Sequence, residues 1–293
     1  MVMSKAIKLI YWADSANFGD SLSPYIIQKL TGAKIRHKIA SLSWLNLIKT
    51  ILGHPKEIIG LSNYVLPWEL NYIGVGSILS YGNSRSRIWG SGFMNTSDKF
   101  YGGKVYAVRG ELSAKKINKN NDYVLGDPAL LLPLLYNAHI TNFNAVGVIP
   151  HWKETSFFKE KYSSRYHIID MCSSNVEQVI DDICSCKMIL STSLHGIIVS
   201  HAYNIPAIWI KESNIDTDGF KFFDYFSSVK IQRYSGFNNY DEILKSLDNV
   251  GDFFASHIDI SLPQISLRKI QKELLSSVPF SLLEEWKQKE CQL

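Results

Sequence analysis

The sequence predicts an α/β fold in which two Rossmann-like domains face a central cleft. Three observations support this prediction. Short runs rich in β-branched and aromatic residues alternate with segments of helical period, as in parallel sheets that helices cover on both faces. The alternation restarts after a polar stretch at residues 136–144. The 293 residues also suffice for two domains of common size.

The expected elements alternate in order along the chain. In the first half, the pattern predicts strands at 5–12, 72–75, 87–89, 105–108 and 123–125, with helices at 21–30 and 111–117. In the second half, it predicts strands at 145–149, 167–171, 187–190 and 207–210, with helices at 176–184, 194–203, 221–227, 240–248 and from 267 to the end, broken at Pro279. The expected domains are residues 1–138 and 139–293, and the C-terminal helices can pack back on the first domain.

The apolar segment 39–66 fits this alternation less well. It has helical period, and one side carries Trp44, Leu45, Leu47, Ile48, Ile51 and Leu52. Packing of this side against the first domain is the favoured interpretation. A helix on a membrane surface is the alternative, in which case the protein makes a peripheral contact with lipid.

Composition and motifs exclude several classes of protein. The formal charge of +4 is spread over the chain, which suits an anionic substrate or a lipid surface and does not predict nucleic-acid binding. The four cysteines lack zinc-site spacing, and the N-terminus indicates a strand rather than a signal peptide, so we expect a cytoplasmic protein. The uncharged stretch 188–210 holds too many polar residues for a membrane span and predicts a strand, a helix and a strand. No dinucleotide fingerprint, P-loop or nucleophile elbow is present.

Two candidate ligand-binding loops lie in the first half, beyond the carboxyl ends of strands. Asn17, Gly19 and Asp20 follow the first strand, where Gly19 permits a tight turn and Asp20 can cap the next helix or contact a sugar. Arg109 ends a later strand, and its guanidinium can form a paired fork with a phosphate or carboxylate, or an ion pair with an acidic side chain. The residue types leave both alternatives open at each loop.

A third loop, in the second half, is the most informative segment. Ser193, Leu194, His195 and Gly196 join a predicted strand to a helix, so free N–H groups and the helix dipole favour an anion there. His195 can move a proton near neutral pH, or it can satisfy a local carbonyl group.

The fourth loop follows the last predicted strand. Its Lys211 and Lys221 can add positive charge to the cleft or can be solvated. Asp216 and Asp218 have the D-x-D spacing with which some glycosyltransferases hold a metal. The surrounding Asn and Gly residues indicate a turn instead, and we expect no metal.

Seven segments, in order, resemble the polysaccharide pyruvyltransferase family. They run from Asn17 to about Tyr225 and read NFGDSLSPYIIQKL, GVGSIL, IWGSGF, VYAVRGELS, LGDPALLLP, VGVIPHW and STSLHGIIVSHAYNIPAIWIKES. The resemblance implies a fold like the two-domain GT-B glycosyltransferases, with the acceptor on the first domain and the donor on the second. It also implies phosphoenolpyruvate as co-substrate, no further cofactor, and a cyclic pyruvyl ketal on a sugar of a bacterial surface polysaccharide, such as an exopolysaccharide or capsule.

The resemblance also implies roles for individual residues. Arg109 matches the family arginine that binds the donor, and Leu194 and His195 match the family's Leu-His pair. Many members carry Arg before this pair, whereas this chain has Ser193. One donor-binding cation is therefore missing at this position.

We expect Lys221, or failing that Lys211, to replace the missing cation, and the Ser193–Gly196 turn to complete the donor site. His195 is expected to transfer a proton or to protonate the phosphate. His151, after the first strand of the second domain, is a reserve candidate for the donor site.

On the acceptor side, Asp20 is expected to orient or deprotonate a hydroxyl group, with Asn17 and Gly19 as further contacts. The expected acceptor is a sugar or a lipid-linked oligosaccharide, and the latter would place the protein at the inner face of the cell membrane. Two alternatives share the architecture. They are a GT-B glycosyltransferase that uses a nucleotide sugar, and a non-catalytic subunit of a glycan-assembly complex.

Overall fold

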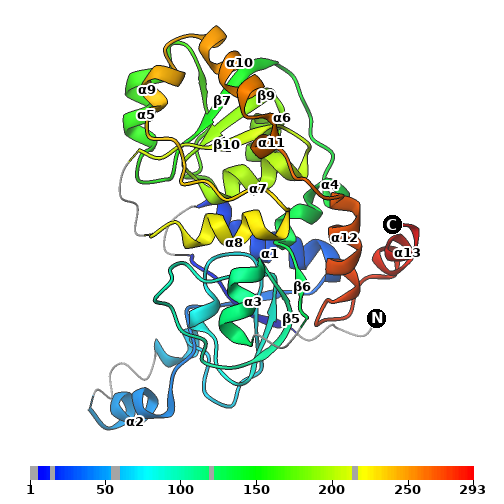
Figure 1. Ribbon diagram of the computed structural model, residues 1–293. Helices are drawn as coiled ribbons and strands as arrows, with labels where there is room; N and C mark the ends of the chain where they lie inside the picture. Colours follow the sequence, from blue (N-terminus) through cyan, green and yellow to red (C-terminus); the bar gives the residue numbers. More distant parts are fainter. Residues whose placement is uncertain (1–5, 14–16, 54–59, 119–121, 213–216) are drawn as a thin grey trace.

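Two parallel β-sheets, one from each half of the chain, lie one above the other with helices between and around them (Figure 1). The computed structural model describes residues 6–13, 17–53, 60–118, 122–212 and 217–293, and of 50–53 the backbone alone. Within these residues, the first sheet contains β1 (Ile7–Ile10), β2 (Ile35–Lys38), β3 (Asn71–Ile73), β4 (Ser86–Trp89), β5 (Lys104–Val108) and β6 (Val124–Leu125). The second contains β7 (Asn144–Ile149), β8 (His167–Ile168), β9 (Cys186–Ser191) and β10 (Ala207–Trp209).

The two sheets share one pattern of strand order. The first runs β2-β1-β3-β4-β5-β6 and the second β8-β7-β9-β10, with all paired strands parallel. In each sheet the chain adds its second strand on one side of the first and its third strand on the other. The order therefore reverses between β1 and β3 and between β7 and β9, and open α/β sheets bind ligands at such switch points. The predicted α/β class with parallel, Rossmann-like sheets is confirmed.

Helices cover the sheets and fill the space between them. The first half supplies α1 (Phe18–Thr31), α2 (Trp44–Gly53), the 3-10 turns η2 (Leu79–Tyr81) and η3 (Pro128–Leu131), α3 (Glu111–Ile117) and α4 (Leu132–Leu135). The second supplies α5 (Thr155–Tyr162), α6 (Val176–Cys184), α7 (Leu194–Ala202), α8 (Phe220–Ser228), α9 (Tyr240–Ile243), α10 (Leu247–Ser256), α11 (Ile258–Ser261), α12 (Leu267–Ser276) and α13 (Glu284–Gln292).

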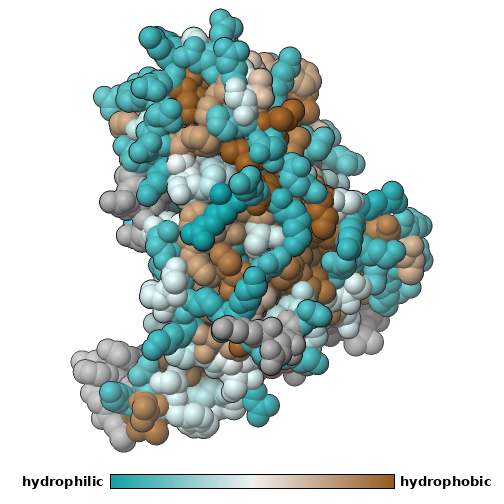
Figure 2. Space-filling view, in the orientation of Figure 1, coloured by the Kyte–Doolittle hydropathy of each residue, from teal (hydrophilic) through white to brown (hydrophobic). Residues whose placement is uncertain are grey.

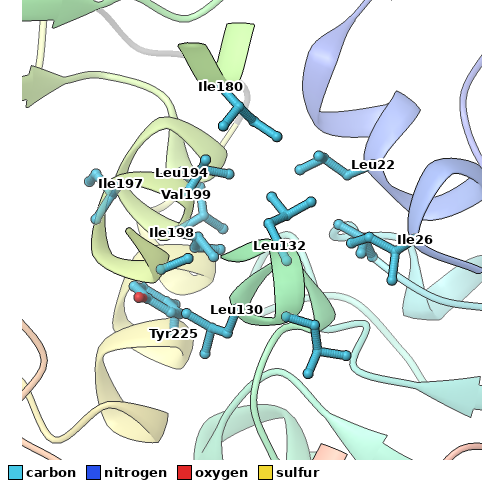
Figure 3. Close-up of a cluster of buried hydrophobic side chains, with 14 of the residues drawn as sticks. Leu22, Ile26, Leu130, Leu132, Ile180, Leu194, Ile197, Ile198, Val199 and Tyr225 are labelled. Carbon is cyan, nitrogen blue, oxygen red and sulfur yellow. The ribbon is translucent and has the colours of Figure 1, made fainter. Parts of the chain in front are cut away.

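A layer of aliphatic side chains joins the two halves (Figure 3). Leu22 and Ile26, one helical turn apart on α1, face Leu132 of α4, while Ile180 of α6 and Ile197 of α7 belong to the same cluster. All five are fully buried, and each such side chain stabilises the fold by about 1.5–3 kcal/mol. The relative position of the two sheets is therefore set by packing in a shared core.

The chain returns to the first sheet after it has completed the second. The indole N–H of Trp89, at the end of β4, donates to the Leu274 carbonyl of α12 over 3.0 Å. The indole N–H of Trp286, in α13, donates to the Lys29 carbonyl of α1 over 3.0 Å. The last two helices therefore pack with the first half of the chain, at the right of Figure 1.

Most predicted elements are present, with shifted ends. The uncharged stretch 188–210 forms most of β9, all of α7 and β10, as predicted, and no helix in the described ranges is long and apolar enough to cross a bilayer. The prediction missed β2, α4, α5 and α11. It also joined α9 to the start of α10 and left out the rest of α10, although the chain turns between Ile243 and Leu247. The expected domain boundary at residues 138 and 139 lies between α4 and β7.

The packing of the apolar segment 39–66 differs from the packing that the sequence favoured. Among its described residues, the one α-helix is α2, which projects from the body of the molecule (Figure 1). Leu47 is buried, but Trp44, Leu45 and Ile48 are exposed. The expected packing of this apolar side against the first domain is therefore wrong for most of the described side chains, because α2 stands away from the sheet.

Leu274→Ala is expected to lower the free energy of unfolding by about 2–5 kcal/mol, because it leaves a cavity where α12 packs on η3 and β6. Leu247→Ala is the control, since its side chain is half-exposed, and it is expected to change this energy by less than about 0.5 kcal/mol. Urea denaturation followed by circular dichroism measures both. Equal effects would contradict the described packing of α12.

Candidate active site

The switch points of the two sheets open into one cleft of about 500 Å³, a volume typical of small-molecule sites. Residues that follow β1, β3 and β4 line one wall, and residues that follow β7 and β9 line the other. The lining residues are Trp12, Asn17, Asp20, Ser77, Ile78, Ser80, Tyr81, Met94, Asn95, Asp98, His151, Trp152, Lys153, Met171, Ser193, Leu194, His195 and Lys221. The cleft therefore lies where the topology of both sheets predicts a ligand.

Three helices begin at this cleft. Asn17 caps α1, with its Oδ1 accepting the Gly19 N–H over 3.1 Å. Ser193 occupies the N-cap position of α7, and Lys221 lies in the first turn of α8. The first N–H groups of a helix have no intrahelical partner and carry partial positive charge. Those that begin α1 and α8 already donate to Met171, Asn17 and Asp218, so the start of α7 and the Lys221 ammonium are what favour an anionic ligand in this cleft.

His195 presents a neutral imidazole to the cleft. Burial, together with the positive charges of Lys221 and Arg109, lowers its pKa to about 3. Its Nε2 is buried and has no hydrogen-bond partner among the described residues, so at this atom the ring does not serve a local carbonyl. A neutral imidazole with an unpaired nitrogen can accept a proton from a ligand or donate a hydrogen bond to it.

Asp20 lies in the same cleft, and its pKa is raised, whereas that of His195 is lowered. Burial raises the pKa of its carboxyl group to about 7, although the nearby Lys221 ammonium opposes this rise. Lys221 is 6% exposed, so its charge acts in a poorly solvated site. Near neutral pH, Asp20 is divided between its acid and base forms, which is the condition for efficient proton transfer.

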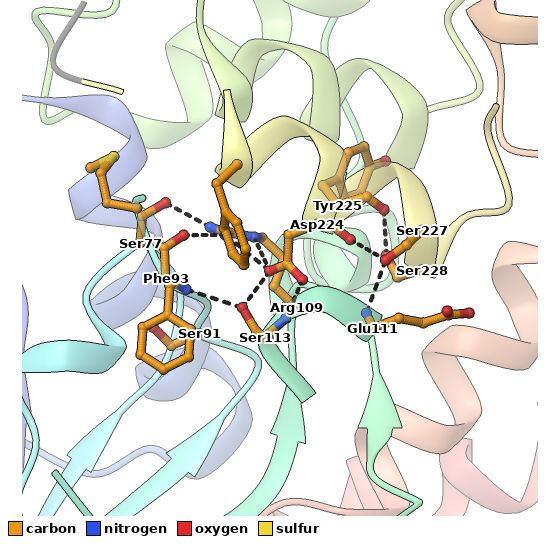
Figure 4. Close-up of polar contacts among 12 residues, drawn as sticks. Ser77, Ser91, Phe93, Arg109, Glu111, Ser113, Asp224, Tyr225, Ser227 and Ser228 are labelled. Carbon is orange, nitrogen blue, oxygen red and sulfur yellow. Dashed lines mark hydrogen bonds and ion pairs between the residues drawn. The ribbon is translucent and has the colours of Figure 1, made fainter. Parts of the chain in front are cut away.

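Arg109 lies behind the cleft wall rather than in it (Figure 4). Its guanidinium is fully buried, with Nε and Nη2 each 3.0 Å from Asp224 Oδ2. Nη2 also donates to the Phe93 carbonyl over 2.5 Å, and Nη1 donates to Ser77 Oγ over 2.6 Å. Of the two alternatives that the sequence left open for Arg109, the structure contains the ion pair with an acidic side chain, Asp224. Arg109 contacts the cleft lining through Ser77, and the direct donor contact expected from the family pattern stays a prediction.

His151, the reserve candidate for the donor site, lies in the cleft wall that the second sheet supplies. Its backbone N–H donates to Thr192 Oγ1 over 2.6 Å, and Thr192 in turn donates to Glu154 Oε2 over 2.5 Å. Thr192 and Glu154 are buried. These bonds fix the loop after β7 against the loop after β9, and so hold both sides of the second switch point.

Besides Arg109, three residues expected to contact a ligand lie outside the cleft lining. Lys211 lines a separate cavity of about 300 Å³. Gly19 and Gly196 are buried, and close packing accounts for both. A Cβ atom at Gly19 would lie 2.3 Å from Nδ1 of His195, and one at Gly196 would lie 2.5 Å from Ser191 Oγ. Gly19 is therefore a residue against which the imidazole rests, and its contact with an acceptor stays a prediction.

The D-x-D pattern falls partly outside the described residues, which include Asp218 but not Asp216. Asp218 Oδ1 accepts the Phe220 N–H at the start of α8 over 3.1 Å, as in the predicted turn. In the described ranges, no three His, Cys, Asp or Glu side chains gather as they would around a metal ion.

Sequence reasoning missed much of the wall that the first sheet supplies. Ser77 and Tyr81 follow β3, while Met94 and Asp98 follow β4. Trp12, after β1, packs edge-on against Tyr81 with ring centroids 5.4 Å apart. Ser77 could have been predicted, because it lies just after a strand in the segment GVGSIL. No pattern in the neighbouring sequence indicates that Tyr81 or Asp98 lines the cleft.

The fold and this cleft define an α/β protein whose two sheets share a site suited to an anionic ligand. Comparison with known proteins gives the family. The polysaccharide pyruvyl transferase family matches residues 17–214, and the chain belongs to it, which confirms the family identified from the sequence. An uncharacterized protein of Acanthamoeba polyphaga mimivirus is 26% identical over 285 residues, which cover 93% of this chain and 91% of that protein. No solved structure matches the chain significantly.

Gly19→Ala is expected to displace the imidazole of His195 and to destabilise the protein by roughly 1–3 kcal/mol, because the added methyl group overlaps Nδ1. Gly251→Ala is the matched control. Nothing lies within 4 Å of its added Cβ, and Ala in a helix interior is favoured over Gly by about 0.5–1 kcal/mol. Chemical denaturation measures both variants, and NMR follows the His195 ring, assigned with His195→Gln. Ring signals that stay unchanged in Gly19→Ala would refute the contact.

The raised pKa of Asp20 predicts a pH dependence of stability. Between its ordinary pKa of 3.8 and about 7, the folded protein holds a proton that the unfolded chain has released. Asp20 therefore makes the protein less stable as the pH rises through this window, and Asp20→Asn removes the effect. The difference in free energy of unfolding, wild type minus Asp20→Asn, is expected to fall as the pH rises from 3.8 to about 7. A constant difference, measured by denaturation, would show an ionised carboxylate throughout.

Proposed function

We propose that this protein transfers the pyruvyl group of phosphoenolpyruvate onto two hydroxyl groups of a polysaccharide sugar, forming a cyclic ketal. Membership of the polysaccharide pyruvyl transferase family supports a pyruvyl transfer reaction. The observation that carries the proposal is the meeting of Lys221, Asp20 and His195 in one cleft beside the start of α7. The donor combines a phosphate with a carboxylate, and a cleft with this charge pattern suits such a ligand.

In this proposal, Lys221 replaces the arginine that the family pattern would place at Ser193, and it binds the donor phosphate. The first N–H groups of α7 bind the remaining oxygens. Arg109 supports this site from behind. Because Ser77 Oγ already accepts an N–H from Arg109, its own hydroxyl hydrogen can be donated into the cleft. The guanidinium thus polarises a donor to the ligand and needs no contact with the ligand itself.

We assign Asp20 as the acid, because burial favours its protonated form, and His195 as the base, because its imidazole is neutral and its Nε2 has no partner among the described residues. This replaces the expected role of Asp20 in orienting or deprotonating the acceptor. Asp20 protonates the methylene carbon of the donor, which makes the adjacent carbon electrophilic, and His195 removes the proton of the first sugar hydroxyl as its oxygen bonds to that carbon. The bond from this carbon to the phosphate oxygen then breaks, and His195 gives its proton to the departing phosphate. The second hydroxyl adds to the same carbon, and its proton restores Asp20. Both residues end as they began.

The acceptor lies on the first-sheet side in this proposal, near Asn17, Trp12 and Tyr81. Two Rossmann-like halves on either side of a cleft, with C-terminal helices returning to the first half, support a GT-B-like arrangement. The acceptor is a sugar of a surface polysaccharide, and the bacterial context expected from the sequence stays a prediction.

Incubation of the protein with phosphoenolpyruvate and a panel of monosaccharides and oligosaccharides tests the reaction. Mass spectrometry is expected to find a pyruvyl ketal on one sugar, with one inorganic phosphate released per ketal. Release of a nucleotide from a nucleotide sugar instead would identify a glycosyltransferase. Binding of phosphoenolpyruvate with no ketal across the panel would identify a non-catalytic subunit.

Lys221→Met is expected to raise the KM for phosphoenolpyruvate by roughly 10- to 100-fold, because it removes a charge-assisted hydrogen bond worth about 1.5–3 kcal/mol. Lys211→Met is the matched control and is expected to keep a near-normal KM, since Lys211 lines a different cavity. Steady-state phosphate release measures both, and circular dichroism verifies folding. Equal effects of the two substitutions would overturn the role given to Lys221.

A further inference from the structure

A second cavity, of about 450 Å³, adjoins the cleft on the side of α2. The two share Ser80 and Tyr81 in their linings, so they are neighbours on either side of these residues. We call this second cavity the outer groove. It is lined by Ala40, Ser41, Leu42, Ser43, Trp44, Asn46, Pro67, Ser80, Tyr81, Gly82, Asn83, Ser84 and Tyr101.

Within the part of the chain that the structure describes, the lining of the outer groove carries no charged side chain, in contrast to the cleft with its Lys221 and Asp20. It combines aromatic rings with small hydroxyl and amide side chains, such as Ser43, Asn46 and Ser84. An uncharged ligand with both apolar and hydrogen-bonding surfaces is therefore the chemical match. A phosphate or a carboxylate would find no cation there.

Aromatic rings extend from the cleft along the outer groove. Tyr81 belongs to both cavities and packs edge-on against Trp12 of the cleft. Further out, Trp44 lies 5.4 Å from Trp68, measured between ring centroids. Trp44, Trp68 and Tyr101 are 59%, 54% and 63% exposed. Figure 2 shows hydrophobic atoms on the protruding lobe that carries α2. Three large, solvent-exposed aromatic rings beside a cavity are suited to packing against a ligand.

We propose that the outer groove binds neutral sugar residues of an oligosaccharide acceptor, next to the residue that enters the cleft. This inference rests on the proposed function, because it extends the acceptor site of that reaction. A sugar ring has one face of C–H groups and a rim of hydroxyls. The C–H hydrogens carry partial positive charge and are attracted to the negative face of an aromatic ring, while the rim hydrogen-bonds to Ser and Asn side chains.

A lipid surface is the rival occupant, because Leu45 and Ile48 of α2 are also exposed. Two observations favour the sugar. Trp44, Tyr81 and Tyr101 line a concave cavity of about 450 Å³ next to the cleft, whereas a bilayer needs a convex or flat contact. Among the described residues, the lining also lacks the Lys and Arg side chains that draw anionic lipid headgroups.

Direct binding tests the inference without any need for turnover. The probes are neutral linear pentasaccharides of glucose, galactose and mannose, with the matching monosaccharides, titrated by tryptophan fluorescence and saturation-transfer NMR. At least one pentasaccharide is expected to bind, and Trp44→Ala is expected to weaken it by roughly 3- to 10-fold. Trp44→Phe keeps a ring and is expected to recover most of the affinity. Phe143→Ala, an exposed ring outside the groove lining, is the matched control and is expected to bind like the wild type.

The outcomes separate this inference from the proposed function. Binding that depends on Trp44, together with failure to form any ketal, would reject the proposed reaction and keep the outer groove as a sugar site. No pentasaccharide binding, or equal binding by Trp44→Ala, would overturn the inference. Vesicles of phosphatidylcholine and phosphatidylglycerol provide the remaining comparison. Vesicle binding that depends on Trp44, without pentasaccharide binding, would assign the surface to the membrane and also overturn the inference.

Discussion

A buried ion pair between Arg109 and Asp224 holds the cleft in shape. Arg109 follows β5 of the first sheet, while Asp224 belongs to α8, which follows the second sheet. Ser113 also donates to Asp224 with both its N–H and its hydroxyl group. All three side chains are fully buried, and removal of one charge would leave the other uncompensated at a cost of about 3–5 kcal/mol. The pair therefore fixes α8 against the first sheet.

This constraint also sets the direction of Lys221. Residues three apart on a helix share a face, so the bond that anchors Asp224 orients Lys221 toward the cleft. Two glycines make room for the pair. A Cβ atom at Gly92 would lie 2.5 Å from Arg109 Cζ, and one at Gly110 would lie 1.7 Å from the Asp224 carbonyl oxygen. The glycines of the family segments IWGSGF and VYAVRGELS therefore permit the packing behind the cleft. Arg109 is held in a buried ion pair, and Lys221 lines the cleft.

The sequence could predict the parallel α/β fold and three of the central cleft residues, Asp20, His195 and Lys221, because each lies in the segment that follows a predicted strand. It could not decide between a ligand contact and an ion pair for Arg109, since the partner, Asp224, lies 115 residues later. The exposure of Trp44 was equally out of reach, because the period of a helix shows that one side is apolar and not what covers it. Local patterns fix elements and strand ends, whereas long-range pairing decides what a charged or apolar side chain meets.

The opposite pKa shifts of Asp20 and His195 have one physical origin. Burial penalises the charged form of each group, so the carboxyl group keeps its proton and the imidazole loses one. An anion that enters the cleft reverses the electrostatic balance for both, because negative charge favours the protonated form of either group. In the proposed reaction, donor binding thus secures the proton on Asp20 and raises the basicity of His195 at the same moment. Under that proposal, the cleft becomes competent for proton transfer only once the charge of the donor has arrived.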